Sequence, residues 1–264
     1  MKTDIKIITL FPDSETSLKL QNKIKQQQGI ATFFAAVDGR EKTPELLSGE
    51  QIDTQRTINY RGNRLNSSEI GCYLSHYRCI YEAYNNNIDK ICILEDDVDI
   101  EDSFYEHLQH IFALPDHFEM IKLMELKRCK RKIAHALSET HQLTRPEKGT
   151  LGAQGYIINR AGMKKILQEG SVLWQPIDKL YDHFWETNVH TFVVEPHLIW
   201  ERETDSSIIK PSFKKPQTSH KNIAWHLRKL KRSIHRKIYI LKRARDFYPH
   251  KKAQQQQGKT NRKT

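Results

Sequence analysis

Three consecutive carboxylates, Glu95, Asp96 and Asp97, directly follow the apolar run Ile91–Leu94. Such a run is typical of a strand buried on both faces of a sheet, so the acids should lie at the end of that strand. Like charges in a partly desolvated site repel one another unless a cation or hydrogen-bond donors offset them. Mn²⁺ or Mg²⁺ would do so, because both ions prefer oxygen ligands and both bridge carboxylates to a diphosphate. The alternative is an acidic turn in which Asp96 or Asp99 caps the next helix.

Side-chain alternation along the strand predicts the direction in which each of the three acids points. In an extended chain, successive side chains point to opposite faces. Glu95 and Asp97 should therefore point one way and Asp96 the other. Two carboxylates could then share one cation, and we expect Asp97 and Glu95 to be its ligands.

A helix is predicted directly before the acidic strand. Ser67 and Ser68 offer an N-cap, and apolar residues then recur at steps of three and four, at Ile70, Leu74, Tyr77, Tyr81 and Tyr84. Ser75 and His76 lie beside this stripe, where a side chain could reach the edge of the sheet. A purely structural role is the alternative for His76.

The first strands predict an α/β fold. Residues 4–10 and 31–37 read as strands joined by a helix over 14–28, an order that favours a parallel sheet. Ligands of such sheets bind beyond the carboxyl ends of strands, where both Asp38-Gly39 and the acids fall. Asp-Gly is also an ordinary turn pair. Residues 40–66 show no clear period and read as a long binding loop or lid.

The second half supplies further candidates. Residues 104–112 read as a helix and 119–124 as a strand, and the basic stretch 125–150 reads as an irregular, solvated face. A glycine-rich stretch ending at Gln154 and Gly155 would let backbone approach a ligand closely before a strand over 156–159 and a helix over 160–170. Asp178 should cap a helix over 178–188, and residues 189–195 form a last strand.

Charge divides the chain into a body and a tail. Residues 220–264 hold 15 Lys and Arg against one acid, so the net charge of +11 comes from the tail and the body is mildly acidic. We expect one domain over residues 1–210, a basic tail over 211–253 and disorder over 254–264. The four cysteines lack zinc-site spacing and read as reduced cytosolic thiols. No signal peptide or membrane span is evident.

The tail carries an amphipathic helix. Its apolar residues are Ile223, Leu227, Leu230, Ile234, Ile238 and Leu241, with Trp225, Tyr239, Phe247 and Tyr248 beside them and Lys/Arg opposite. This pattern favours an anionic membrane surface, bound through residues 220–250 with the aromatic rings at headgroup level. Nucleic-acid binding and docking on the body are the rivals. The acidic body argues against a nucleic-acid partner.

Taken together, these motifs resemble glycosyltransferase family 25, the bacterial lipooligosaccharide galactosyltransferases and their collagen-modifying relatives. The resemblance covers about residues 4–210 and is carried by Asp38-Gly39, Glu69–His76, Ile93–Val98, Gly155–Ile158 with Ala161-Gly162, and Pro176–Asp178. One departure concerns residues 14–28, which contain no Arg where the family usually has one. The Ala161-Gly162 pair also differs from the family's usual Gly-Ala.

The resemblance implies a GT-A type (Rossmann-like) domain that binds a UDP-sugar and transfers the sugar with inversion. Asp97 would then hold Mn²⁺ or Mg²⁺ against the diphosphate, and Glu95 or Asp96 would meet the ribose or the sugar hydroxyls. The remaining assignments place Ser75 and His76 in the nucleotide pocket, Gln154 and Gly155 at the donor sugar, Asp178 as the base with Asp182 and Glu201 in reserve, and His183, His190 or His197 as a third metal ligand.

The function expected on this basis is transfer of galactose from UDP-galactose to a lipooligosaccharide or lipopolysaccharide acceptor. The enzyme would be cytoplasmic and peripherally associated with the inner membrane. The alternatives are glucose transfer from UDP-glucose, and a catalytically silent nucleotide-sugar-binding protein on the same fold.

Overall fold

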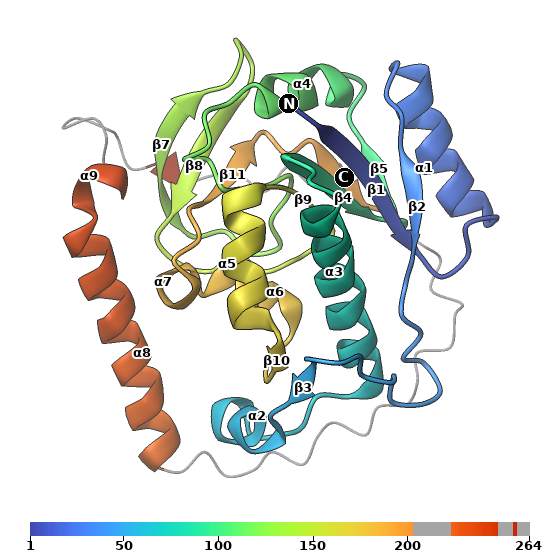
Figure 1. Cartoon of the computed structure of the whole chain (residues 1–264). Helices are drawn as coiled ribbons and strands as arrows, with labels where there is room; N and C mark the ends of the chain where they lie inside the picture. The colour runs from blue at the N-terminus through green and yellow to red at the C-terminus, as the bar shows by residue number, and fades with distance from the viewer. Residues whose placement is uncertain (203–222, 248–255, 258–264) are drawn as a thin grey trace.

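A nine-stranded mixed sheet forms the centre of the molecule in a computed structural model that describes residues 1–202, 223–247 and 256–257 (Figure 1). Its strand order is β13-β7-β8-β11-β6-β9-β4-β1-β2. The strands are β1 (Thr3–Thr9), β2 (Thr32–Ala35), β4 (Lys90–Glu95), β6 (Met120–Lys122), β7 (Lys130–Ala136), β8 (Gln142–Pro146), β9 (Gly155–Asn159), β11 (Thr191–Glu195) and β13 (Gln256–Gln257). Two small ribbons pair β3 (Gln51–Ile52) with β10 (Val172–Leu173), and β5 (Val98–Ile100) with β12 (Ile199–Glu201).

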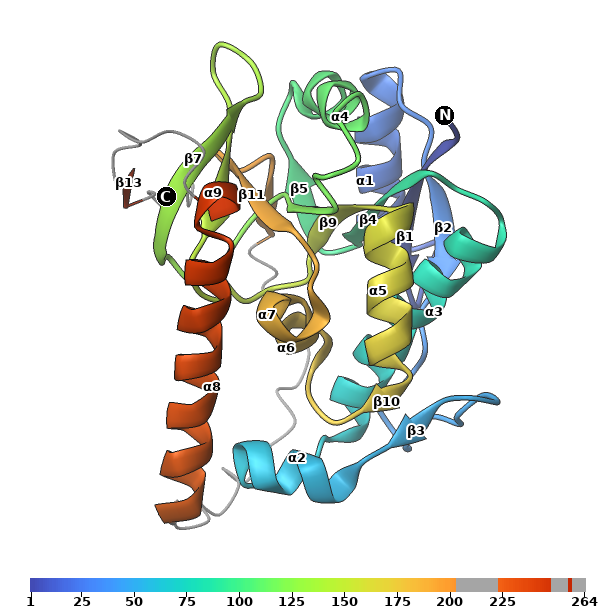
Figure 2. The same cartoon turned by 60° about the vertical axis from the view of Figure 1, so that its left-hand side comes forward.

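Helices cover both faces of the sheet (Figures 1 and 2). They are α1 (Glu15–Gln26), α2 (Thr54–Arg61), α3 (Ser67–Asn85), α4 (Phe104–Phe112), α5 (Arg160–Gly170), α6 (Ile177–Asp182), α7 (Phe184–Thr187), α8 (Ile223–Lys242) and α9 (Ala244–Phe247). Apolar side chains of α1 and α4 share one core cluster, and those of α3, α5 and α6 share another. The α/β class expected from the sequence is confirmed.

Strand β4 contributes to both cores. Ile91 and Ile93 belong to the α3 and α5 side, whereas Cys92 and Leu94 belong to the α1 and α4 side. All four are fully buried, as predicted for a strand covered on both faces. Because the two faces alternate, the residue after Leu94 turns toward α3 and the next one toward α1.

The predicted β-α-β unit is present, since β1 lies parallel to both β2 and β4. The chain passes from β1 outward to β2 and then returns to β4 on the other side of β1. The strand order therefore reverses between β1 and β4, and such switch points carry the ligand crevices of open α/β sheets. Farther along, β9 runs antiparallel to β4 and β6, so the sheet as a whole is mixed.

Three sequence predictions about local structure were wrong. Residues 40–66 contain β3 and α2, the latter capped by Asp53 and ended by left-handed Gly62. Helix α3 is capped by Asn66, which forms a capping box with Glu69, rather than by a serine. The basic stretch 125–150 forms the β7–β8 hairpin.

Arg131 of that hairpin is buried rather than solvated. It forms ion pairs with Glu125 and Glu195, two carboxylates that are themselves buried. The hairpin is therefore fixed to the sheet by charge pairing that a one-dimensional charge run does not reveal.

The region after Pro176 also differs from the prediction. The single helix expected over 178–188 is two short helices, α6 and α7, that meet at His183. The N-cap of α6 is Pro176, and no side chain caps the helix. Asp178 therefore lies in the first turn of α6 and is not its cap.

Helix α8 packs against the body through one face. Trp225 donates its indole N–H to the carbonyl of Tyr60 at 3.0 Å, and the Tyr239 hydroxyl donates to Asn188 at 3.1 Å. Ile240 is buried against Phe184 and Trp185 of α7. Trp225 and Tyr239 thus contact protein, contrary to the expected headgroup position.

The end of the predicted domain and parts of the predicted tail fall outside the described residues. These are 203–222, 248–255 and 258–264, which include Tyr248 and most of the segment expected to be disordered. Gln256 and Gln257 form β13, which pairs with β7. In the part of the chain that is described, no helix combines the length and apolar character needed to cross a bilayer.

Candidate functional site

The acids lie at the switch point between β1 and β4. Glu95 ends β4 and is in register with Ile8, so Thr9 and Asp96 emerge side by side at the carboxyl ends of neighbouring parallel strands. The predicted alternation holds for the first two acids: Glu95 faces α3 and Asp96 faces α1, as their hydrogen bonds show.

Asp96 is held by hydroxyl groups. Its Oδ2 accepts hydrogen bonds from Thr9 Oγ1 and from Ser17 Oγ, the latter at 3.1 Å. Ser17 lies in the first turn of α1 and is bonded to the N-cap residue Ser14. Neither Asp96 nor Asp99 caps α4, whose N-cap is Ser103, so the capping alternative is wrong.

Glu95 is oriented by a buried chain of rings. Its Oε1 lies 3.1 Å from Nε2 of His76, whose Nδ1 lies 3.1 Å from the Tyr156 hydroxyl. Tyr156 in turn lies 2.8 Å from the hydroxyl of Tyr181. If Nε2 donates to Glu95 and Nδ1 accepts from Tyr156, every one of these contacts is satisfied. His76 thus fixes the carboxylate from behind.

Asp97 carries a charge with which no cation of the described residues forms an ion pair. Its side chain is exposed to solvent, yet the pKa of Asp97 is raised to about 7. The causes are crowding by protein atoms and then repulsion by Glu95, Asp96 and Glu201. Excess negative charge of this kind is what a divalent cation offsets, so the residues present fit Mn²⁺ or Mg²⁺.

Among the described residues, Cys72, His76 and Glu95 form a possible ligand set that does not include Asp97. One ligand atom each of Cys72, His76 and Glu95 lies within 4.8 Å of the others, which is close enough to bind one ion. The His residues proposed as third ligands have other neighbours: His183 bonds to Tyr60, His190 bonds to Arg243, and His197 lies near Arg131.

Asp178 reaches this site from α6. Burial raises the pKa of the Cys72 thiol, and the negative charges of Glu95, Asp178 and Asp97 raise it further, so these acids lie near Cys72. Burial raises the pKa of Asp178 itself, only partly offset by Lys179 and Lys122. A raised pKa makes this carboxylate a better base than the cap position assumed from the sequence would allow.

The reserve bases are engaged with protein groups. Asp182 is buried and forms an ion pair with Lys122 at 2.9 Å, and it also accepts from the amides of Thr150 and Leu151. It thereby fixes the glycine-rich segment to α6. Glu201 accepts from Gln154 Nε2 at 2.6 Å.

The remaining predicted donor contacts lie around the site. The carbonyl of Gln154 accepts from the Glu95 amide at 2.8 Å. Ser75 is buried, donating to the Gly71 carbonyl and accepting from the Val37 amide. Packing explains why residue 155 is a glycine, because a Cβ there would lie 2.3 Å from Ile199 Cδ1. A donor-binding role for any of them stays a prediction.

Comparison with known proteins agrees with this geometry. A family model described as Glycosyltransferase family 25 (LPS biosynthesis protein) matches residues 3–181. The chain belongs to glycosyltransferase family 25. The matched region holds β1, β4 with its acids, α3 and Asp178, and ends just before Asp182.

Curated relatives within family 25 are distant and longer. Procollagen galactosyltransferase 1 of Danio rerio is 22% identical over 223 residues, which is 75% of this chain and 36% of that protein. A probable inactive glycosyltransferase 25 family member 3 of Rattus norvegicus is 23% identical over 215 residues, 74% of this chain and 37% of the relative. The chain thus spans little more than a third of either protein.

Similarity to solved structures is weak. A197 from STIV aligns with a TM-score of 0.37 and 10% identity, covering 73% of this chain and 81% of A197. Mannose-1-phosphate geranyltransferase from Thermus thermophilus gives 0.36 and 10%, covering 74% of each chain. Scores this low support no inference about the family 25 chain.

Several residues of the site escaped the sequence analysis. They are Thr9, Ser17, Tyr156, Tyr181 and Arg202. The Arg202 amide donates to the Asp97 carbonyl at 2.8 Å, and its guanidinium donates to the Thr16 carbonyl at 3.1 Å. This places an arginine beside α1, the helix that lacks the arginine usual in the family. The Ser14 and Ser17 hydroxyls just after the first strand were the one available signal.

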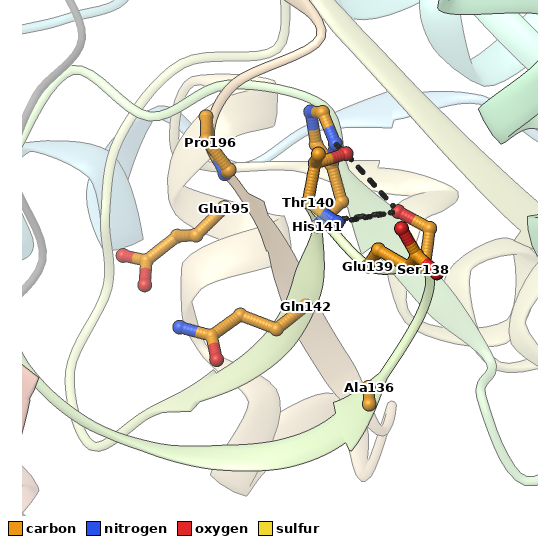
Figure 3. A pocket seen from close by; sticks show the side chains of 8 residues that line it. All are labelled: Ala136, Ser138, Glu139, Thr140, His141, Gln142, Glu195 and Pro196. Carbon is orange, nitrogen blue, oxygen red and sulfur yellow. Dashed lines mark hydrogen bonds between the residues drawn. The ribbon is translucent and has the colours of Figure 1, made fainter.

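A separate hollow lies at the tip of the β7–β8 hairpin (Figure 3). Its volume is about 480 Å³, and none of the acids that end β4 lines it. Ser138 Oγ accepts from the His141 amide (Figure 3). The ring of His141 lies 3.2 Å from Glu101. These polar groups are bonded to one another, so we place the chemistry at the β1–β4 switch point instead.

Proposed function

We propose that the chain transfers a hexose from a UDP-sugar to a hydroxyl group of a glycan, with inversion at the anomeric carbon. Galactose from UDP-galactose is the proposed donor, and a lipooligosaccharide or lipopolysaccharide core is the proposed acceptor. The observation that carries this proposal is the uncompensated charge at Asp97, located at the switch point where nucleotides bind in α/β sheets.

In the proposed reaction, the oxygen of the acceptor hydroxyl attacks the anomeric carbon while Asp178 accepts the proton of that hydroxyl. The bond between that carbon and the diphosphate oxygen breaks, and UDP departs with the bonding pair. A single displacement needs this base, because the attacking hydroxyl gains positive charge in the transition state. Burial raises the pKa of Asp178, so the ionised carboxylate binds a proton more strongly than an ordinary Asp does.

The ligands of the ion would be Asp97 and Glu95, with Cys72 nearby as a softer donor. When bound, Mn²⁺ or Mg²⁺ supplies Lewis-acid neutralisation of the charge that builds on departing UDP. The hydrogen bond with His76 holds Glu95 in one orientation, and the hydrogen bonds from Thr9 and Ser17 hold Asp96 toward α1.

Transfer assays with and without EDTA test this function directly. Transfer from UDP-galactose should be lost in EDTA and restored by Mn²⁺, whereas UDP-glucose in the same assay tests the alternative donor. Activity that is unchanged by EDTA would contradict the metal assignment.

A second candidate is a catalytically silent binding protein. One observation favours it: the relatives include a protein described as a probable inactive family member. Titration calorimetry that shows UDP binding together with no turnover on any core acceptor would support this candidate over the enzyme.

We also propose that α8 attaches the protein to an anionic membrane surface. Leu227, Leu230, Ile234, Ile238 and Leu241 form its outward row and are between 44% and 73% exposed. The helix has seven Lys and Arg and no acid. If the α8 helices of two protein copies packed together, their positive charges would repel. An anionic membrane instead offers negative headgroups for the cations and acyl chains for the apolar row.

A further inference from the structure

Three side chains of different chemistry converge between α3 and the end of β4. Cys72 and His76 are four positions apart on α3, so they lie one turn apart on the same face of the helix. Glu95, at the end of β4, is hydrogen-bonded to His76 from the sheet side. One ligand atom of each lies within 4.8 Å of the other two, and Asp97 does not belong to this group.

Close backbone packing fixes this part of α3. A Cβ on Gly71 would lie 2.6 Å from the carbonyl oxygen of Val37, so the glycine lets the helix approach the segment that follows β2. The next residue, Cys72, is exposed, whereas His76 is 1% exposed. An ion that enters from solvent at Cys72 would therefore reach a buried, fixed imidazole.

The spacing of the three ligand atoms fits a tetrahedral ion. Glu95 Oε1 lies 3.1 Å from His76 Nε2 and 3.9 Å from Cys72 Sγ. Zinc bonds of about 2.0–2.1 Å to nitrogen and oxygen and about 2.3 Å to sulfur, at tetrahedral angles, would place these pairs about 3.3 and 3.6 Å apart. Each observed distance is close to the expected one, so small side-chain shifts would be enough to bind the ion.

His76 already has the outer partner that a metal-binding imidazole needs. Its Nδ1 lies 3.1 Å from the Tyr156 hydroxyl, which lies 2.8 Å from the hydroxyl of Tyr181. With an ion on Nε2, the proton of the neutral ring is on Nδ1. A hydroxyl accepts as well as it donates, so Tyr156 would hold the ring in this tautomer too.

The types of ligand atom select the metal. A thiolate, a carboxylate and a neutral imidazole together carry two negative charges, which balance one divalent cation. Thiolate sulfur favours Zn²⁺, whereas Mn²⁺ and Mg²⁺ prefer oxygen. Asp97 and Asp178 lie close enough to Cys72 to act on its charge, and their negative charges would attract a cation. Three protein ligands with a fourth position left to water form an open zinc site.

We propose that Cys72, His76 and Glu95 bind Zn²⁺, with water as the fourth ligand, at a site separate from the cation proposed for Asp97. The two sites share Glu95, so Zn²⁺ would compete for a carboxylate that the proposed function assigns to Mn²⁺ or Mg²⁺. Zinc binding itself does not depend on glycosyl transfer, and it is tested below without a sugar nucleotide.

Titration of the full chain with Co²⁺ tests the ligand set. Co²⁺ occupies zinc sites, and a thiolate ligand gives it a charge-transfer absorption band in the near ultraviolet. We expect this band in the wild type, its removal by added Zn²⁺, and its absence in Cys72→Ser. The matched control is Cys129→Ser, which changes another partly exposed thiol and should keep the band. A band that survives Cys72→Ser, or a wild type that shows no band, would overturn the proposal.

Competition with a chromophoric chelator measures the affinity for Zn²⁺. Cys72→Ser should weaken Zn²⁺ binding by at least about a hundredfold, since loss of an outer partner alone costs about 10- to 100-fold. Equal Zn²⁺ affinity in Cys72→Ser and Cys129→Ser would contradict the assignment. Asp97→Asn should retain the cobalt band, because Asp97 is not a ligand of this site. Loss of the band in Asp97→Asn would place the ion at Asp97 and overturn the separate zinc site, while leaving the proposed glycosyl transfer untouched.

Discussion

Neighbouring acids in the triplet have different surroundings, and this difference supports the roles that we propose for them. Asp96 is bonded to the hydroxyls of Thr9 and Ser17, and Glu95 is bonded to His76, whereas Asp97 meets mainly other negative charges. A bound cation would offset the repulsion between Asp97 and the neighbouring carboxylates. A carboxylate that the fold leaves in such surroundings indicates a functional site.

Asp178 is the residue whose loss should affect chemistry and not binding. Asp178→Asn keeps the size of the side chain and removes the base, so transfer should fall by about 10²- to 10⁴-fold with donor affinity unchanged. Because burial raises the pKa of Asp178, the rate should rise with pH until that carboxylate is ionised. Steady-state kinetics over a pH series, with UDP titration alongside, measures both effects.

The control for this substitution is Asp102→Asn, because the Asp102 side chain is fully exposed and its ion pair with Lys23 is long at 3.8 Å. An Asp178→Asn variant that retains wild-type turnover would show that another group takes the proton.

Single elements were predictable where one physical rule dominates. The parallel β1-α1-β2 unit, buried β4, α4, and the β9-α5 pair all follow from hydrophobic period and glycine positions. The side-chain alternation that separates Asp96 from Glu95 also followed from the sequence. In these stretches the local pattern and the tertiary packing favour the same structure.

The failures occurred where partners distant in sequence decide the structure. Arg131 reads as a surface charge but pairs with Glu195, 64 positions away. Asp182 reads as a reserve base and His76 as a nucleotide contact, yet they bond to Lys122 and Tyr156, which lie 60 and 80 positions away in the sequence. A periodic pattern contains no information on such pairs, and the hydroxyl partners of Asp96 were missed for the same reason.

The buried His197, which follows β11, predicts acid sensitivity. His197, next to Arg131, is 3% exposed, and burial with that charge lowers its pKa to about 4 from 6.5. Between these values the unfolded chain binds a proton that the folded chain does not, so stability falls as pH falls. From pH 7 to pH 5 this linkage costs about 2 kcal/mol.

Urea unfolding of the wild type and of His197→Gln at the two pH values measures this cost. The variant keeps every other titrating group, so its loss between pH 7 and pH 5 should be smaller by about that amount. Parallel pH profiles for the two proteins would show that His197 titrates normally.

At the scale of the whole molecule, charge and apolar surface are separated. The acids lie at one switch point of the sheet. Helix α8, which packs on α7, carries cations and an exposed row of aliphatic side chains. Figure 2 shows α8 along one side of the body, next to α7. A membrane-bound α8 would leave the β1–β4 edge free for a nucleotide sugar and a glycan.

Substitution of the outward row tests membrane attachment. Leu230→Ser with Ile234→Ser removes apolar area without touching the face that contacts Tyr60 and Trp185, so stability should change little. Sedimentation with anionic vesicles should fall at least about tenfold, since each buried side chain contributes about 1.5–3 kcal/mol. Transfer to a soluble acceptor should persist. Unchanged sedimentation would exclude α8 as the membrane contact.

The central claim is that Asp97, at the end of β4, holds a cation that binds the diphosphate of a sugar nucleotide. Calorimetric titration of UDP with and without Mn²⁺, on the wild type and on Asp97→Asn, tests it most directly. The matched control is Asp99→Asn, whose carboxylate is already paired with Lys23 at 3.0 Å. We predict that Mn²⁺ strengthens UDP binding about tenfold or more in the wild type and in Asp99→Asn, and not in Asp97→Asn. The same UDP affinity in all three proteins, with or without Mn²⁺, would contradict the account.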